Sequence, residues 1–476
     1  MKNKKALIVI IILTVIILLA LIPWVLVAMR FIDGGALPFF SSEEEIETDE
    51  DYEYTYDDED EEEYPDYPEY EPDPNVGSEF TFAEETIVNI SDEFPYLINE
   101  LRTISSEYNS IAVSLVAFDG ATSTFYTYQY GFADMENRQA VTEDTRFRVA
   151  SLSKLVTAIC AMVLVDEGLL DLDTDISMYL GYEVRNPHFP DTPITARMLL
   201  QHTSAVFDSG AFHVSRENYT NESLQSVLER DTSFRRRQPG VTFEYTNFGY
   251  SILAAVCEMI FGDSIDAMAR ELIFEPLGID AAFVAENLRD TQNIAVMYND
   301  RHAVTRSVQT QLAVSESGEP GHDLHLAQSN LTISAIDYAR ILMMLGNGGI
   351  LGDTRILSQE SVSIMHRTDV SAPNYRQGLG LRFNDNEFLS NSGIFWHTGS
   401  SYGTFTQFAY VLGHNTNRGV VVLTTGATIS RLPTGLINLC NDLSLAVWNG
   451  IWYPQQNANE NTNEERHYYS GVSGDY

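Results

Sequence analysis

The stretch FRVASLSK, residues 147–154, decides how the rest of the chain is interpreted. A polar segment, residues 142–145, precedes it and an apolar run over residues 155–165 follows it, so we expect Ser151 to open a buried helix. Residues three positions apart share one face of a helix, which would place the amine of Lys154 beside the hydroxyl of Ser151. The free N–H groups at a helix start also favour an anionic oxygen. The pattern predicts a serine nucleophile with a lysine base, and a serine that only caps the helix is the alternative.

Lysine is used sparingly in this chain. Four of the 28 cationic residues are lysines, and three of these, Lys2, Lys4 and Lys5, lie at the N-terminus. Arginine stays protonated in proteins, whereas a lysine that is buried or close to other cations can lose its proton. We therefore interpret the remaining lysine, Lys154, as a group retained for proton transfer.

Residues 6–29 are almost entirely apolar and carry no charge. A helix of this length crosses a hydrocarbon layer of about 30 Å. A cleavable signal peptide is the alternative, but its apolar core normally has roughly 7 to 15 residues. Three lysines precede the segment and only Arg30 closely follows it, which predicts a single-pass anchor in the cell membrane with residues 1–5 in the cytoplasm and the globular part outside.

Negative charge dominates the composition, with a formal net charge of −40 at pH 7. Nineteen carboxylates and no Lys or Arg occur between Glu43 and Asp73, so we expect residues 30–78 to form a disordered, charged stalk. Binding of calcium or of a basic partner is the alternative for this segment. The acidic balance argues against nucleic acid as a partner. Residues 454–476 are polar and Asn-rich, and we interpret them as a disordered tail.

Residues 79–453 are predicted to form one globular region of mixed α/β class. The elements expected near its two ends are a helix, a hairpin, two strands and a closing helix, at residues 92–105, 110–118 with 123–130, 403–412, 419–425 and 436–447. Helical patterns predominate between them, at residues 154–167, 250–260 and 334–345. We expect an antiparallel sheet flanked by helices and built from both chain ends, with an inserted, mainly helical domain.

The cysteines and histidines give little reason to expect a disulfide framework or a metal. Cys160, Cys257 and Cys440 each lie in an apolar stretch, and an odd number without regular spacing favours buried thiols. His322 and His325 lack the further ligands that a zinc site requires. We therefore expect neither a metal nor a cofactor.

Three motifs resemble those of one enzyme superfamily. Residues 151–154, Ser-Leu-Ser-Lys, resemble the first motif of the serine β-lactamases and penicillin-binding proteins. Two further stretches resemble the branch that contains class C β-lactamases, D-alanyl-D-alanine carboxypeptidases and related esterases. In TFEYTNFGY, residues 242–250, Tyr245 and Asn247 match the Tyr-x-Asn motif, and WHTGS, residues 396–400, matches the third motif. The similarity runs from about residue 92 to residue 449.

The resemblance implies a β-lactamase/transpeptidase-like fold and an acyl-enzyme on Ser151. It implies that Lys154 and Tyr245 share the proton transfers, and that Tyr245 needs a nearby positive charge, with Lys154 as the candidate. It also implies an oxyanion hole made by the N–H groups of Ser151 and Ser400. The residues that it places along the substrate are Asn247, His397, Thr398, Gly399 and Ser400.

The chain departs from the family pattern at three places. His397 stands where many relatives have lysine, so we expect a positive charge there that depends on pH. Ala205 and the pair Ser329-Asn330 stand where the family usually has glycines. The implied function is an extracytoplasmic serine hydrolase that acts on cell-wall stem peptides like a D,D-carboxypeptidase. An esterase, a class C-like β-lactamase, and a penicillin-binding or sensing protein without turnover are the alternatives.

Overall fold

The computed structural model describes residues 84–209, 223–316, 319–322, 325–385, 393–413 and 416–453. The predicted anchor, stalk and tail, residues 6–29, 30–78 and 454–476, lie outside these residues. Within the described ranges, no helix is both long enough and apolar enough to cross a membrane.

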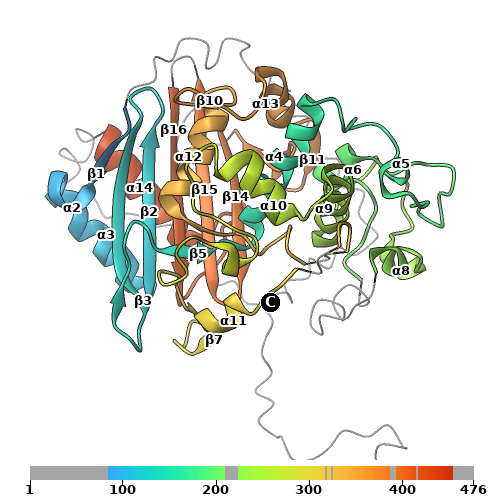
Figure 1. Cartoon of the computed structure of the whole chain (residues 1–476). Helices are drawn as coiled ribbons and strands as arrows, with labels where there is room; N and C mark the ends of the chain where they lie inside the picture. Colours follow the sequence, from blue (N-terminus) through green and yellow to red (C-terminus); the bar gives the residue numbers. More distant parts are fainter. Residues whose placement is uncertain are drawn as a thin grey trace, which may run out of the picture. The chain divides into compact units, whose positions relative to one another are not determined.

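A ten-stranded sheet forms the centre of the described region, in the order β1-β3-β2-β16-β15-β14-β13-β12-β11, with β4 paired to β3 (Figure 1). Its strands are β1 (Thr86–Asn89), β2 (Ala112–Asp119), β3 (Thr124–Asp134), β4 (Gln139–Ala140), β11 (Val370–Ala372), β12 (Tyr375–Gln377), β13 (Arg382–Asn384), β14 (Ile394–Ser401), β15 (Thr404–Gly413) and β16 (Thr416–Thr425). The N-terminal hairpin β2–β3 joins the C-terminal strands through an antiparallel pairing of β2 with β16, in which Ala112 lies opposite Thr425. The prediction of a sheet built from both chain ends is therefore confirmed.

Two features of the sheet differ from the prediction. Strand β1 runs parallel to β3, with Thr86 opposite Thr124, so the sheet is not purely antiparallel. Strands β11, β12 and β13 come from residues 370–384, in the part of the chain that was expected to be mainly helical. Strands of three residues contain too few positions to show an alternating pattern, so periodicity cannot reveal them.

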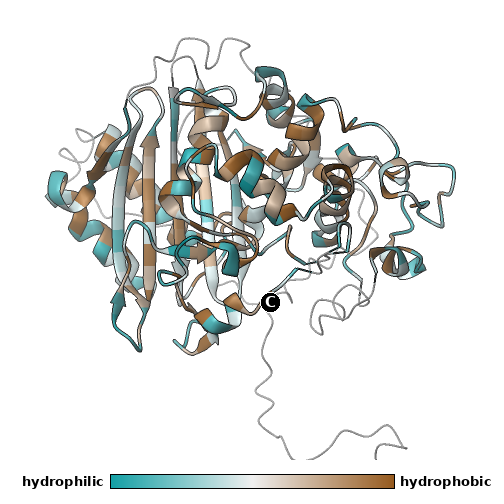
Figure 2. Ribbon diagram, viewed as in Figure 1, coloured by the Kyte–Doolittle hydropathy of each residue, from teal (hydrophilic) through white to brown (hydrophobic). Residues whose placement is uncertain are grey.

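Helices cover both faces of the sheet (Figure 1). On one face lie α2 (Ile90–Glu93), α3 (Pro95–Glu107) and α14 (Asn438–Trp452), and on the other lie α4 (Ser153–Asp166), α9 (Asn247–Phe261) and α12 (Ala335–Gly346). All eight residues of β2 are buried, because both faces of the strand are covered. Figure 2 shows apolar residues both along the central strands and on the helices that lie against them.

The expected helices at residues 154–167, 250–260 and 334–345 correspond to α4, α9 and α12. The remaining named elements are α5 (Ser177–Leu180), α6 (Ala196–Leu200), α8 (Leu224–Leu228), α10 (Ile265–Ala269), α11 (Val308–Leu312), α13 (Gln359–His366), β5 (Arg146–Arg148), β6 (Met297–Tyr298), β7 (Val304–Arg306), β8 (Thr332–Ser334), β9 (Ile350–Leu351) and β10 (Thr354–Arg355). The three cysteines are free and buried, as predicted.

Candidate functional site

Ser151 lies in a tight turn between β5 and α4. Residues Ala150–Leu152 form a single 3-10 turn that continues directly into the helix. Ala150 has φ +49°, a left-handed conformation that is uncommon for a residue with a side chain. Ser153 fastens the turn, because its Oγ donates to Ala150 O at 2.6 Å and accepts the N–H of Leu331 at 3.0 Å. The serine therefore occupies a conformation that its surroundings enforce.

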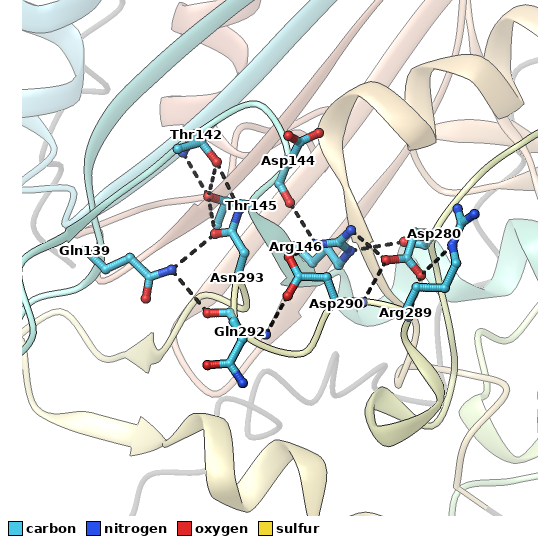
Figure 3. Close-up of polar contacts among 10 residues, drawn as sticks. All are labelled: Gln139, Thr142, Asp144, Thr145, Arg146, Asp280, Arg289, Asp290, Gln292 and Asn293. Carbon is cyan, nitrogen blue, oxygen red and sulfur yellow. Dashed lines mark hydrogen bonds and ion pairs between the residues drawn. The ribbon is translucent and has the colours of Figure 1, made fainter.

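The strand that leads to Ser151 is held by polar contacts with residues 280–293 (Figure 3). Arg146 of β5 forms an ion pair with Asp280 at 2.6 Å, and both side chains are about nine-tenths buried. Thr145 donates to Asn293 Oδ1 at 2.9 Å, and the N–H of Arg146 donates to Asn293 O at 2.9 Å. These contacts connect β5 to a distant part of the chain and fix the direction from which the strand enters the turn.

Lys154 is fully buried, and its amine faces Ser151. Its Nζ lies 3.3 Å from Ser151 Oγ, and it donates to Asn247 Oδ1 at 2.8 Å and to Gln328 O at 3.0 Å. The last two atoms are carbonyl oxygens, which only accept, so each is matched to an N–H of the amine. A neutral amine in this position would direct its lone pair toward the Ser151 hydroxyl and could accept its proton.

The phenol of Tyr245 completes the contacts around Ser151. It forms a hydrogen bond with Ser151, and its ring centre lies 5.0 Å from Lys154 Nζ. Burial raises the pKa of Tyr245, and this effect exceeds the lowering by Arg382 and by the hydrogen bond with Ser151. The phenol is therefore protonated at neutral pH in the resting site. The cation that most favours a phenolate here is Arg382, whereas the sequence had pointed to Lys154.

A carboxylate orients Asn247, the first residue of α9. Asp208 Oδ2 accepts both the backbone N–H and the side-chain Nδ2 of Asn247, each at 2.9 Å. Asp208 Oδ1 accepts the N–H of Phe248 at 2.8 Å and the hydroxyl of Thr246 at 2.5 Å. An anion is stabilised at a helix N-terminus by these unpaired N–H groups. Because Nδ2 is engaged by Asp208, the amide oxygen of Asn247 is turned toward Lys154.

The third motif lies on β14, against the turn that carries Ser151. A Cβ atom at Gly399 would lie 2.4 Å from Val149 O and 3.2 Å from Ala150 Cβ, so only glycine permits this approach. Thr406 of β15 donates to the same Val149 oxygen at 2.8 Å. This contact brings Thr398, Gly399 and Ser400 alongside the serine turn. Gly399 thus has a packing role in addition to the substrate contact that the resemblance implies.

His397 is buried, and its Nδ1 lies 2.7 Å from Thr398 O, so this nitrogen carries the proton. Burial lowers the pKa of His397 well below its usual value, and the charges of Arg382 and Lys154 lower it further. Burial and the same two cations also depress the pKa of His202, whose ring centre lies 4.4 Å from that of Tyr245. Both imidazoles are neutral near pH 7. The expectation that His397 changes charge in the neutral range is therefore wrong.

Arg382 on β13 is the cation that the sequence analysis missed. It is 9% exposed, and its Cζ lies 5.2 Å from the ring centre of Tyr245, 4.7 Å from that of Tyr375 and 5.2 Å from that of Trp396. Its Nε has no hydrogen-bond partner, and no carboxylate among the described residues pairs with it. The guanidinium thus lies against three aromatic rings, and its Nε has no partner among the described residues. The sequence signal was a charged residue inside the apolar stretch 379–383.

The structure brings together Ser151, Lys154, Tyr245 and Asn247 through hydrogen bonds, and it places the third motif beside them. It adds groups that the sequence analysis did not single out: Asp208, His202, Gln328, Arg382 and Arg431. Arg431 is exposed and donates to the hydroxyl of Thr398 at 3.2 Å. These residues come from separate loops and strands, so no local motif connects them to the serine.

Comparison with known proteins identifies relatives over most of the described region. The profile of the beta-lactamase family matches residues 98–433. The chain is 26% identical to penicillin-binding protein 4 of Amycolatopsis lactamdurans over 317 residues, covering 62% of this chain and 76% of that protein. It is 28% identical to penicillin-binding protein 4* of Bacillus subtilis (strain 168) over 159 residues, 33% of this chain and only 34% of that protein. Esterase EstB of Burkholderia gladioli is 29% identical over 205 residues, 40% of this chain and 50% of its own length.

Solved structures with the same fold include two kinds of protein. A penicillin-binding protein homologue from Pyrococcus abyssi, described as octameric, superposes with a TM-score of 0.59 at 23% identity, covering 75% of this chain and 78% of that one. A class C beta lactamase from Rhodobacter sphaeroides superposes with a TM-score of 0.56 at 20% identity, covering 75% of this chain and 98% of that one. These likenesses establish the β-lactamase/transpeptidase-like fold.

Replacing Asp208 by asparagine tests the positioning of Asn247. The change removes a charged acceptor, so the Asn247 amide can rotate and Lys154 loses its Oδ1 contact. We expect the rate at which a fluorophosphonate labels Ser151 to fall about 10- to 100-fold, as displacement of a positioned group does. Asp231→Asn, at an exposed residue, is the matched control and should keep the original rate. An Asp208→Asn protein that labels at the original rate would show that Asp208 is not a positioning residue.

The neutral state of His397 predicts the pH dependence of activity. Its pKa is depressed in the folded protein, so the imidazole gains a proton only well below pH 6.5. Between about pH 6 and 8, kcat/KM should show no ionisation that belongs to His397. His397→Asn should change the level of activity without changing the shape of this pH profile. A transition near pH 6.5 in the original protein that disappears in the variant would contradict the assignment.

Proposed function

Because this chain belongs to the beta-lactamase family, we propose that it is a membrane-anchored serine hydrolase that works outside the cytoplasm through an acyl-enzyme on Ser151. The substrates we propose are cell-wall peptides with a free terminal carboxylate, so that the activity resembles that of a D,D-carboxypeptidase. The observation that carries this choice is the buried guanidinium of Arg382, which lacks a carboxylate partner among the described residues, next to the catalytic groups.

The proposed reaction uses the contacts around Ser151 in two stages. Ser151 Oγ attacks the carbonyl carbon while its proton passes to Lys154, and the N–H groups of Ser151 and Ser400 receive the negative oxygen. Tyr245 relays the proton to the leaving nitrogen, and the carbon–nitrogen bond breaks. In the second stage water attacks the acyl carbon and gives a proton to the same groups, which return a proton to Ser151 Oγ as the carbon–Oγ bond breaks and the acid is released. Asn247 holds Lys154 in line during both stages.

Arg382 supports a substrate that ends in a carboxylate. His397 and His202 are neutral because burial and nearby cations lower their pKa values, so neither supplies a positive charge. A guanidinium in a site of low polarity binds a carboxylate through two parallel hydrogen bonds, and both partners gain from the pairing. Arg431 donates to the hydroxyl of Thr398, two residues beyond Trp396, which lies opposite Arg382 in the β13–β14 ladder, and we propose that both groups add donors for this carboxylate.

Other activities of the family are the second candidates. The similarity to Esterase EstB favours an esterase, which would need no terminal carboxylate on its substrate. A class C-like β-lactamase would form the same acyl-enzyme with a cyclic amide. A binding or sensing protein would retain the pocket without turnover, but the approach of the Lys154 amine to Ser151 favours chemistry.

The anchor can be tested by deletion. Removal of residues 6–29 should move the protein from the membrane pellet to the soluble fraction, because this segment is the long apolar run that precedes the globular region. Deletion of an equal length from the acidic segment, residues 45–68, is the control and should leave the protein in the membrane. If the protein that lacks residues 6–29 stays in the membrane pellet, the proposed anchor is contradicted.

Hydrolysis of paired peptides tests the proposed substrate class. A peptide ending in D-Ala-D-Ala with a free carboxylate should be cleaved at least about tenfold faster than its amidated form, since the charge of Arg382 is used only by the former. Arg382→Gln should remove this difference. The release of the terminal residue by the full chain, followed by chromatography, measures both rates.

Ser151→Ala separates the chemistry from its specificity. Both peptides should remain intact with this variant, and a fluorophosphonate or fluorescent penicillin should no longer label it. Equal cleavage of the two peptides by the original chain would contradict only the proposed role of Arg382 and not the serine chemistry. Labelling of Ser151 together with ester cleavage but no peptide cleavage would favour the esterase, and absence of labelling and of all cleavage would favour the binding protein.

A further inference from the structure

Tyr402 occupies the turn between β14 and β15 in an unusual conformation. Ser401 pairs with Thr404, so Tyr402 and Gly403 form a two-residue turn, and both have positive φ, +52° and +76°. Such turns normally contain Asn, Asp or Gly, and a bulky side chain at positive φ is rare. Thr305 donates to Tyr402 O at 2.6 Å and stabilises the turn. Strain of this kind is retained where a side chain has a task.

Two guanidinium groups lie against the Tyr402 ring. The Cζ of Arg306, on β7, lies 3.9 Å from the ring centre, and that of Arg148, on β5, lies 5.5 Å from it. Both distances are within the range of cation–π contacts. Arg148 is buried and donates to Ser329 O at 3.1 Å, whereas Arg306 is partly exposed and donates to Thr305 O at 3.1 Å.

The charge of Arg306 is not neutralised within the described part of the chain. No described Asp or Glu lies within ion-pair distance of its guanidinium. The neighbouring Arg146 and Arg289 differ, because both pair with Asp280 in the network of Figure 3. In a chain with a net charge of −40, carboxylates are abundant, so an arginine that lies against a ring with no carboxylate partner among the described residues is available to bind an anion.

Along β14, these cations and Arg382 lie on opposite sides of Ser400. Tyr402 is two residues beyond Ser400 on the same chain, about 7 Å at the rise of an extended strand. In the β13–β14 ladder Arg382 lies opposite Trp396, which precedes Ser400 on β14, whereas Tyr402 follows it. Strand β5 is joined to the segment just before the β6–β7 hairpin, because the N–H of Arg146 donates to Asn293 O and Arg146 O accepts the N–H of Ala295.

We propose that Arg306 and Arg148, held on Tyr402, form a second anion site that takes a carboxylate on the acyl side of the scissile bond. An extended substrate beside β14 also advances about 3.3 Å per residue. An acidic side chain on the acyl residue can therefore span the distance from Ser400 to Tyr402. The inference rests on the proposed function, in which Arg382 takes the terminal carboxylate on the leaving side. The substrate class is thus a peptide with carboxylates on both sides of the cleaved bond.

The rate at which Ser151 is labelled tests this site without requiring peptide turnover. The probes are two alkyl fluorophosphonates of equal length whose tails end in a carboxylate or in the corresponding carboxamide. The tail of such a probe lies on the acyl side, so the full chain should react about tenfold faster with the carboxylate, the effect of one charge-assisted contact. Arg306→Gln should bring the ratio of the two rates close to one, and Arg306→Lys should leave an intermediate ratio.

Two further variants separate the site from general effects. Arg301→Gln removes an exposed cation from the tip of the same hairpin and should keep the ratio of the original chain. Tyr402→Phe retains the aromatic ring and should also keep this ratio of labelling rates. Thermal unfolding checks that each variant is folded. Equal labelling of the original chain by both probes, or a ratio that survives Arg306→Gln, would overturn the second anion site and leave the proposed function intact. Absence of labelling by either probe would overturn both.

Discussion

The site depends on one buried amine and the groups that hold it. Lys154 has no exposed surface, and its Nζ is placed between the Ser151 hydroxyl, the Asn247 amide and the Gln328 carbonyl. Burial makes a charged amine costly and a neutral one accessible, which is the state that can accept a proton. The carbonyl oxygens fix where its N–H groups point, so the direction of its lone pair is also fixed. The remaining features of the fold serve to maintain this arrangement.

Rigid contacts on three sides maintain it. The β5 strand is tied to residues 280–293 by the Arg146–Asp280 ion pair, and the turn at Ala150 is closed by Ser153. Strand β14 approaches this turn only because Gly399 has no side chain. Asp208 turns Asn247 at the start of α9 toward the amine. Apart from the Ser153–Ala150 contact, these contacts join different segments of the chain, so the geometry of the site is a property of the packed sheet and helices.

Burial influences which groups around the serine are charged. The pKa values of His202 and His397 are pushed down by desolvation and by nearby cations, which leaves the imidazoles neutral. Arg382 lies against Tyr245, whose pKa burial raises despite the nearby guanidinium. The site therefore combines two neutral imidazoles with the guanidinium of Arg382. The chemistry at the serine and the proposed recognition of anionic groups beside it thus use different residues.

The sequence by itself determined the family, the sheet built from both chain ends and the partners Ser151 and Lys154, because helical periodicity and three-residue spacing are local properties. Its third motif identified residues 396–400, but not the strand β14 that carries them or why a glycine is needed there. The short strands β11–β13, the orienting carboxylate of Asp208, the guanidinium of Arg382 and the neutral state of His397 were decided only by tertiary structure. The physical reason is that burial, and contacts between separate segments of the chain, set hydrogen-bond partners and pKa values, and no spacing along the chain encodes them.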